Sequence, residues 1–208
     1  MNVACVYRSG GDFTAADVAA LRRGVSAHLP LPHRFVCLTD RTAEVDALGM
    51  DIDAVALSHD WRGWWAKMCL FGFPFDGPTL YFDMDTVIVG DPSEFASYTG
   101  PLAMLSDFYR PDFAESGVMA FTPGPVTDAV WRAFVANPTA AMRSGGDGKF
   151  IRAQAPSADR LQSLYPGQLV SYKVHCLPKG GVPDGARVVC FHGQPRPSSL
   201  PADHWVFR

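Results

Sequence analysis

The stretch Leu80-Tyr81-Phe82-Asp83-Met84-Asp85-Thr86-Val87-Ile88-Val89 sets two carboxylates between two apolar runs. Each apolar run is typical of a buried strand, so the two aspartates lie where one strand ends and the next begins. Side chains two residues apart on an extended chain point the same way, which lets Asp83 and Asp85 face one ligand. Because carboxylates are costly to bury alone, the pattern predicts a bound cation such as Mn²⁺ or Mg²⁺. The alternative is a turn with two solvated aspartates.

Strands and helices are predicted to alternate on either side of this segment. Apolar runs predict strands over 2–7, 33–38, 51–57, 78–82, 86–89, 102–105, 117–121, 168–174 and 187–191. Apolar residues at helical spacing predict helices after the cap residue Thr14, within 61–73 and over 126–135. This alternation is typical of an α/β domain with a mixed, mainly parallel sheet flanked by helices. We expect a single domain over residues 1–208, with a Pro-rich tail over 193–208.

Composition limits the classes of partner and compartment. The chain has 208 residues and a net charge of -3, which argues against a basic surface for nucleic acid. No apolar run reaches the roughly 18 residues that cross a bilayer, and the N-terminus lacks the features of a secretion signal. The five cysteines are scattered and form no CxxC pair, which predicts buried free thiols instead of disulfides or zinc ligands. A cytoplasmic location is expected, with peripheral attachment to a membrane left open.

Two classes of enzyme use paired aspartates in this setting. In glycosyltransferases of the GT-A fold, an Asp-x-Asp segment holds a metal ion on the donor diphosphate. In haloacid-dehalogenase-like phosphatases, a segment that Asp83-Met84-Asp85-Thr86-Val87 also satisfies supplies a nucleophile and an acid. Such a phosphatase carries the segment on its first strand and needs a later acidic pair, yet here several predicted strands precede it and no acid follows Asp147 before Asp159. A third alternative is a non-catalytic relative that binds a nucleotide sugar or a protein partner.

Six segments carry a resemblance to a known family. They are Val3-Ala4-Cys5-Val6-Tyr7, Phe35-Val36-Cys37-Leu38-Thr39-Asp40, Trp64-Trp65-Ala66-Lys67, Tyr81-Phe82-Asp83-Met84-Asp85-Thr86-Val87, Ser116-Gly117-Val118-Met119-Ala120-Phe121 and Cys190-Phe191-His192-Gly193-Gln194-Pro195-Arg196-Pro197. Through them the sequence resembles bacterial glycosyltransferases of the GT-A fold, and it is distantly similar to glycogenin-like and lipopolysaccharide galactosyltransferase-like enzymes. The resemblance implies hexosyl transfer with retention from a nucleotide-diphosphate sugar, UDP-sugar favoured, to an unknown acceptor hydroxyl.

The resemblance also implies a metal site. Asp83 would contact the donor ribose and the ion, Asp85 would ligate the ion directly, and His192 would be the third protein ligand. A set of carboxylates and a neutral imidazole suits Mn²⁺, with Mg²⁺ as the alternative.

The same resemblance assigns further residues to the donor and to catalysis. The donor residues are Tyr7, Arg8 and Asp40 for the base and ribose, Lys67 and Arg196 for the diphosphate, and Ser116 and Gly117 for the sugar. An inverting enzyme would need a carboxylate base, for which Asp147, Glu115 and Asp107 are candidates. The segment Gly146-Asp147-Gly148-Lys149 lacks the amide that relatives carry after the aspartate, which leaves the role of Asp147 open. Trp61, Trp64 and Trp65 would form either an aromatic wall for a sugar or part of the core.

Overall fold

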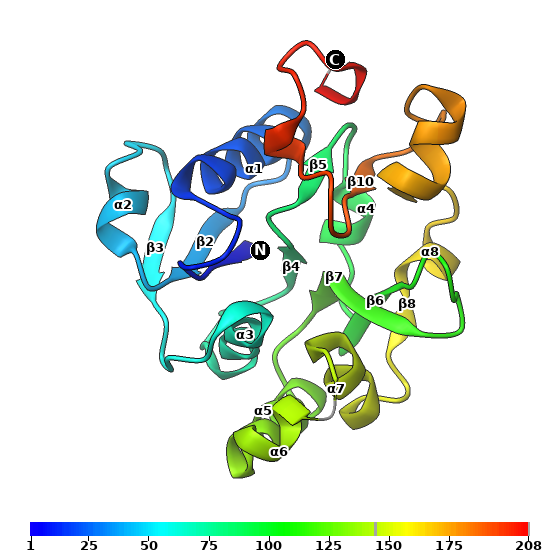
Figure 1. Cartoon of the computed structure of the whole chain (residues 1–208). Helices are drawn as coiled ribbons and strands as arrows, with labels where there is room; N and C mark the ends of the chain where they lie inside the picture. The colour runs from blue at the N-terminus through cyan, green and yellow to red at the C-terminus, as the bar shows by residue number, and fades with distance from the viewer. Residues whose placement is uncertain (144, 208) are drawn as a thin grey trace.

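A seven-stranded sheet lies at the centre of the fold (Figure 1). The structure, a computed structural model, describes residues 1–143 and 145–207, so Arg208 at the end of the predicted domain and tail lies outside the described residues. The strand order is β3 (Asp53–Ala56), β2 (Arg34–Thr39), β1 (Asn2–Tyr7), β4 (Thr79–Phe82), β7 (Ala114–Phe121), β6 (Leu102–Ser106) and β8 (Asp159–Arg160). The first four strands in this order are parallel, whereas β7 runs antiparallel to β4 and β6. The predicted mixed, mainly parallel sheet is confirmed.

Helices cover both faces of the sheet. The α-helices are α1 (Ala15–His28), α2 (Thr42–Asp46), α3 (Cys69–Gly72), α4 (Ser93–Ala96), α5 (Pro125–Ala136), α6 (Pro138–Arg143), α7 (Asp147–Gln154) and α8 (Leu161–Leu164). Short 3₁₀ helices occupy Gly63–Met68, Leu177–Lys179, Pro197–Ser199 and Trp205–Phe207. At the start of α1, the backbone N–H of Thr14 donates to the carboxylate of Asp17 at 2.8 Å. This hydrogen bond belongs to a capping arrangement, as expected for the predicted cap residue Thr14.

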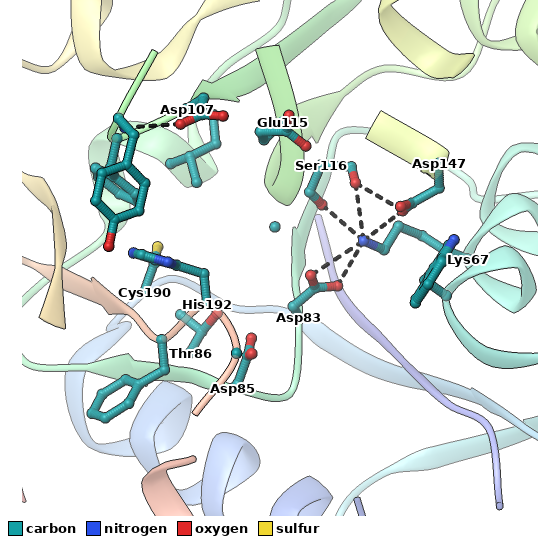
Figure 2. A pocket seen from close by; sticks show the side chains of 17 residues that line it. Lys67, Asp83, Asp85, Thr86, Asp107, Glu115, Ser116, Asp147, Cys190 and His192 are labelled. Atoms are coloured by element: carbon teal, nitrogen blue, oxygen red, sulfur yellow. Dashed lines mark hydrogen bonds and ion pairs between the residues drawn. The ribbon is translucent and has the colours of Figure 1, made fainter. Parts of the chain in front are cut away.

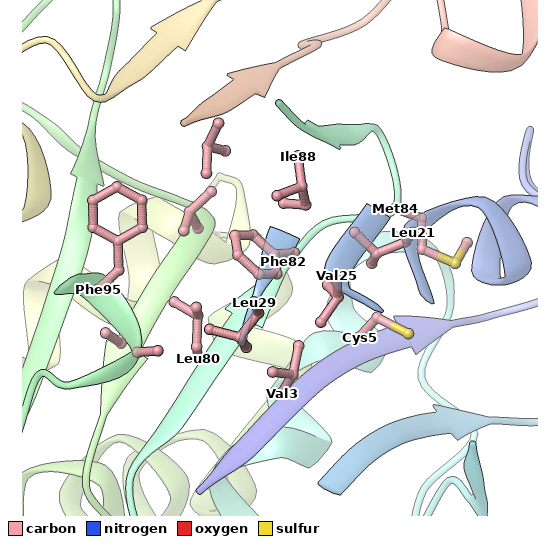
Figure 3. Packing of buried hydrophobic residues seen from close by; sticks show 14 of the residues in the cluster. Val3, Cys5, Leu21, Val25, Leu29, Leu80, Phe82, Met84, Ile88 and Phe95 are labelled. Atoms are coloured by element: carbon pink, nitrogen blue, oxygen red, sulfur yellow. The ribbon is translucent and has the colours of Figure 1, made fainter. Parts of the chain in front are cut away.

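Alternate side chains of the central strands enter two separate cores. Val3 and Cys5 of β1 and Phe82 of β4 pack against α1 on one face, as Figure 3 shows. Ala4 lies between Val3 and Cys5 in β1, and Tyr81 directly precedes Phe82 in β4. Both belong to the core on the other face, with residues of α3, α5 and α7. Because successive side chains of a strand point to opposite faces, continuous apolar runs such as 79–82 are required here.

A second sheet of three strands adjoins the first. It consists of β5 (Thr86–Ile88), β10 (Val188–Cys190) and β9 (Leu169–Ser171), with β10 antiparallel to β5 and parallel to β9. The segment Asp83-Met84-Asp85 is the link between β4 and β5, so it joins the two sheets. Cys190 is opposite Thr86, and the backbone N–H of Phe191 donates to the carbonyl oxygen of Asp85 at 3.0 Å. This pairing brings the residues after β10 beside the two aspartates.

One predicted strand is partly wrong. The strand expected over 168–174 ends at Ser171, and the chain forms a π-helical turn over Tyr172–Cys176. The hydroxyl of Ser171 accepts the N–H of Val174 at 3.1 Å, which caps this turn. Val170 and Tyr172 are buried in this arrangement, and so the apolar pattern could not distinguish it from a strand. The other predicted strands and helices are present, with ends that differ by a few residues.

All five cysteines are buried and free, as predicted. Among the residues that the structure describes, no helix has both the length and the apolar character needed to cross a bilayer. The adjacent tryptophans Trp64 and Trp65 differ in burial. Trp65 is buried and its ring stacks with Phe134 at 5.6 Å, whereas Trp64 is exposed.

We predict that Phe134→Ala lowers the free energy of unfolding by about 3–5 kcal/mol, because it leaves a cavity at the centre of the α5 core. Phe134 is fully buried and contacts the rings of Trp61, Trp65 and Phe150. Urea denaturation followed by tryptophan fluorescence measures the change. Val135→Ala is the matched control, because Val135 is adjacent on the helix and 36% exposed. The control should change stability by about 0.5 kcal/mol or less, and equal losses in both variants would contradict the prediction.

Candidate active site

Two adjoining pockets open at the link between the two sheets. The first, of about 360 Å³, is the carboxylate pocket; its polar lining consists of Lys67, Asp83, Asp85, Thr86, Asp107, Glu115, Ser116, Asp147 and His192 (Figure 2). The second, of about 380 Å³, is the N-terminal pocket, lined in part by Arg8, Asp12, Phe13 and Arg196. Trp64, Lys67, Asp83 and Asp85 line both pockets. Ligands of open α/β sheets bind beyond the carboxyl ends of the strands, and the aspartates that follow β4 lie at such an end.

A buried lysine holds the carboxylate pocket together. Lys67 is only 5% exposed, and its ammonium lies 2.9 Å from Asp83 and 2.8 Å from Asp147. It also donates to the hydroxyl of Ser116 at 3.0 Å, which in turn donates to Asp147 at 2.8 Å (Figure 2). Burial alone would lower the pKa of Lys67, but the carboxylates of Asp147 and Asp83 outweigh burial and raise it. Lys67 is therefore a permanent cation shared by two acids.

The two aspartates of the link are crowded. Burial raises the pKa of Asp83, against the opposing effect of Lys67. Burial and the neighbouring charge of Asp83 raise the pKa of Asp85 to about 7. Asp85 is ion-paired with Arg196, and the hydroxyl of Tyr81 donates to Asp83. Arg196 also lies 3.3 Å from Asp12 and over the ring of Phe13 at 4.8 Å, so the tail is joined to both the link and the N-terminal segment.

His192 lines the same pocket as the two aspartates. Its Nε2 is 2.6 Å from the hydroxyl of Ser171, and its ring stacks with Phe108 at 5.7 Å. Burial, followed by the charge of Lys173, lowers its pKa, which favours the neutral imidazole that ligates metals. Within residues 1–143 and 145–207, no three His, Cys, Asp or Glu side chains lie close enough together to hold an ion. The donor set lining the pocket, two carboxylates and a neutral imidazole, nevertheless fits Mn²⁺ in its chemistry.

The predicted base and ribose residues are only partly brought to the pockets. Arg8 lines the N-terminal pocket and is ion-paired with Asp40 and Asp60. Tyr7 and Asp40 line neither of the two pockets. Tyr7 is buried and its hydroxyl donates to Glu44 at 3.2 Å, while Asp40 accepts the N–H of Ser9 at 2.8 Å. Burial would raise the pKa of Asp40, but hydrogen bonds from Ser9 and the charge of Arg8 lower it. Asp40 thus orients Arg8 in this structure.

The three candidate bases differ in their freedom to act. Asp147 is held by Lys67 and Ser116. Asp107 accepts the backbone N–H groups of Tyr109 and Arg110 at 2.8 and 3.0 Å, so it shapes its own turn. Glu115 lines the pocket, pairs with Arg152 at 3.3 Å and has its pKa raised by burial against the effect of that arginine. Glu115 is therefore the carboxylate best placed to meet a ligand.

Gly148 explains the missing amide after Asp147. A β-carbon at this position would lie 2.6 Å from Glu115 Oε2 and 3.2 Å from the backbone nitrogen of Ser116. Helix α7 thus packs directly on β7, which places Asp147 against Lys67. The signal in the sequence was the glycine itself, since close approach of two backbones requires this residue.

The fold is shared with known enzymes, although the sequence shows no match. No protein-family model and no curated protein match the chain. Its structure is similar to the glycosyltransferase GlyE of Streptococcus pneumoniae TIGR4, with a TM-score of 0.71, 13% identity, and coverage of 96% of this chain and 56% of GlyE. It is also similar to the galactosyltransferase LgtC in complex with donor and acceptor sugar analogues, with a TM-score of 0.67, 14% identity, and coverage of 99% of this chain and 92% of LgtC.

The chain has the GT-A fold. The predicted fold and the distant resemblance to glycosyltransferases of this fold are thereby confirmed. The chain spans little more than half the length of GlyE but nearly the whole of LgtC. At these identities the similarity concerns the fold alone.

We predict that Lys67→Met lowers the free energy of unfolding by about 3–5 kcal/mol, because buried Asp147 and half-buried Asp83 are left without their cation. Urea denaturation at pH 7 measures the loss. Lys149→Met is the control, since Lys149 is exposed on α7, the helix that begins with Asp147. A Lys67→Met protein as stable as this control would show that the lysine does not hold the pocket together.

Proposed function

We propose that this chain is a metal-dependent glycosyltransferase that moves a hexosyl group from a nucleotide-diphosphate sugar, with UDP-sugar favoured, to an acceptor hydroxyl. One observation carries the proposal: two adjoining pockets share Asp83, Asp85 and Lys67 at the carboxyl end of a GT-A sheet. A nucleotide sugar also has two ends joined by a charged centre. The nucleoside would occupy the N-terminal pocket beside Arg8, the sugar would occupy the carboxylate pocket, and the diphosphate would lie where the pockets meet.

The charged residues at this junction would act on the leaving group. Asp83, Asp85 and His192 line the same pocket and would hold Mn²⁺ once their side chains move closer together; the ion would supply positive charge to the leaving diphosphate. Arg196 lies at the same place, paired with Asp85 and Asp12. Its guanidinium can exchange these carboxylates for phosphate oxygens, which it can bind with two parallel hydrogen bonds. Lys67 would hold Asp83 and Asp147 in position, because its ammonium is already engaged with both.

In the proposed transfer, the acceptor oxygen forms a bond to the anomeric carbon as the bond from that carbon to the diphosphate oxygen breaks. The bonding electrons pass to the diphosphate, and the acceptor hydroxyl proton passes to the departing phosphate oxygen. Positively charged groups accelerate this step if they bind the departing diphosphate more strongly in the transition state than in the bound donor. We propose retention at the anomeric carbon, as the resemblance implies. Asp147 and Asp107 are engaged in other contacts, so Glu115 is the candidate base that an inverting reaction would use.

No observation favours the phosphatase alternative. The solved structures that share the fold are glycosyltransferases, and the segment Asp83-Met84-Asp85 follows β4 instead of the first strand. The five buried thiols support the expectation of a reducing, cytoplasmic compartment. A non-catalytic relative would bind the donor without turnover, which the activity measurements below distinguish.

We predict that Mn²⁺ and UDP together raise the thermal midpoint by about 5–10 °C at one hundred times the dissociation constant, because the ligand binds only the native state. Asp85→Ala should abolish the part of the shift that depends on Mn²⁺. Asp184→Ala is the control, since Asp184 is exposed in the turn before β10. A midpoint that no nucleotide shifts in the presence of metal would contradict the proposed donor site. A full shift in Asp85→Ala would exclude this residue as a ligand.

We predict that the product keeps the anomeric configuration of the donor, which proton NMR of the anomeric signal measures during turnover. Retention requires no protein base for the acceptor, so Glu115→Gln should lower the rate by about tenfold at most. A base in an inverting reaction contributes about 10²–10⁴-fold. Inverted product together with a loss of that size would instead identify Glu115 as the general base.

A further inference from the structure

Tyr81 is a buried polar side chain beside the link, and the proposed transfer does not use it. It belongs to β4, is 1% exposed and packs in the core on the face of α3, α5 and α7. The hydroxyl of a buried tyrosine needs a hydrogen-bond partner, and here the partner is the carboxylate of Asp83. The ring of Tyr81 therefore belongs to the core, while its hydroxyl acts on a residue of both pockets.

The strand itself brings Tyr81 and Asp83 together. The two residues are two positions apart, so their side chains leave the extended chain on the same face. The main chain of Asp83 is held at both of its polar groups: its N–H donates to the carbonyl oxygen of Gly117 at 2.8 Å, and its carbonyl oxygen accepts the N–H of Thr86 at 3.1 Å. Only the rotation of the Asp83 side chain is left to determine, and the bond from Tyr81 acts on this rotation.

The donors around Asp83 occupy most of its acceptor positions. A carboxylate has about four such positions, two on each oxygen. Oδ1 accepts the hydroxyl of Tyr81 and lies 2.9 Å from the ammonium of Lys67 (Figure 2). Oδ2 lies 3.2 Å from the same ammonium, and no other hydrogen bond reaches it from residues 1–143 and 145–207. The free acceptor position of Asp83 is therefore on Oδ2.

Lys67 cannot by itself decide which oxygen of Asp83 faces a ligand. Its ammonium approaches both oxygens and is shared with Asp147, which lies 2.8 Å away. The hydroxyl of Tyr81 distinguishes the two oxygens, because it bonds to Oδ1 only. The ring of Tyr81 also contacts the cation, since the ammonium lies 5.4 Å from the ring centre, within the range of a cation–π interaction.

The remaining side of Asp83 is open to a ligand. Its side chain is 32% exposed, and it lines both the carboxylate pocket and the N-terminal pocket. Tyr81 lines the N-terminal pocket as well, but with almost no accessible surface. A ligand where the two pockets meet thus contacts the carboxylate, and the tyrosine acts on that ligand through Asp83.

We propose that Tyr81 is a positioning residue: its hydroxyl holds Oδ1 of Asp83, so that Oδ2 faces the ligand where the two pockets meet. The inference rests on the proposed function, in which Asp83 helps to hold a divalent cation. Removal of a hydrogen-bond partner behind a metal ligand weakens metal binding by about 10–100-fold. Tyr81 takes no part in the transfer itself.

The test is Tyr81→Phe, which removes the hydroxyl and keeps the ring in the core. This variant should bind Mn²⁺ about 10–100-fold more weakly, as measured by electron paramagnetic resonance of the free ion during titration of the protein without nucleotide. Tyr98→Phe is the matched control, because the hydroxyl of Tyr98 also donates to a carboxylate, that of Asp159, at 2.7 Å, and neither residue lines the two pockets. Unchanged affinity in Tyr81→Phe, or an equal loss in both variants, would overturn the inference.

A second measurement separates this inference from the proposed function. If the unmodified chain binds neither Mn²⁺ nor UDP, the proposed function is refuted, and the contact between Tyr81 and Asp83 is tested without a ligand. Urea denaturation then compares the effect of Tyr81→Phe in the unmodified chain with its effect in Asp83→Ala. A larger loss of stability in the unmodified chain supports the orienting contact. Equal losses in both backgrounds would show that the hydroxyl does not act on Asp83, which overturns the inference.

Discussion

The buried ion pairs of Lys67 with Asp83 and Asp147 determine how the candidate site is built. Four elements meet at this ammonium: the 3₁₀ helix that carries it, the end of β4, the middle of β7 and the start of α7. A buried charge is tolerated only when its partners are all in place, because desolvation of each ion costs several kcal/mol. The elements around the pocket are therefore positioned together, and displacement of one leaves charges without partners. This coupling provides the rigid support that a site for a charged ligand requires.

The link between the two sheets is joined to the C-terminal tail mainly through side-chain contacts. Asp85 is paired with Arg196, a residue 111 positions away in a segment without α-helix or strand structure. The main-chain bond from Phe191 to Asp85 ties the end of β10 to the link, but the arginine is held chiefly by side-chain contacts to Asp12, Asp85 and Phe13. The N-terminal pocket thus has one side formed by the sheet and one side formed by the tail, whose arginine is held by side-chain contacts.

The sequence alone predicted the two aspartates, the strand that precedes them and the mixed sheet, because these depend on local apolar patterns. It could not predict that Lys67 would pair with Asp83 and Asp147, since contacts between distant residues leave no local pattern. Trp64 and Trp65 show the same limit: both are apolar and adjacent, and only the phase of the 3₁₀ helix decides which one is buried. The π-helical turn after Ser171 was mistaken for a strand because its buried residues are equally apolar. The position of Tyr7 beside Glu44 instead of a pocket likewise depends on tertiary packing.

Gly148 couples the packing of α7 to the charge pairs of the pocket. Where the resemblance leads one to expect an amide, the backbone of α7 lies so close to β7 that even a β-carbon would approach Glu115 and Ser116 within 3.3 Å. A side chain at this position would displace the Glu115 carboxylate and move the start of α7 from β7 by a few tenths of an ångström. That movement would lengthen the contact between Asp147 and Lys67. An uncharged residue therefore helps to set the charge pairing of the pocket.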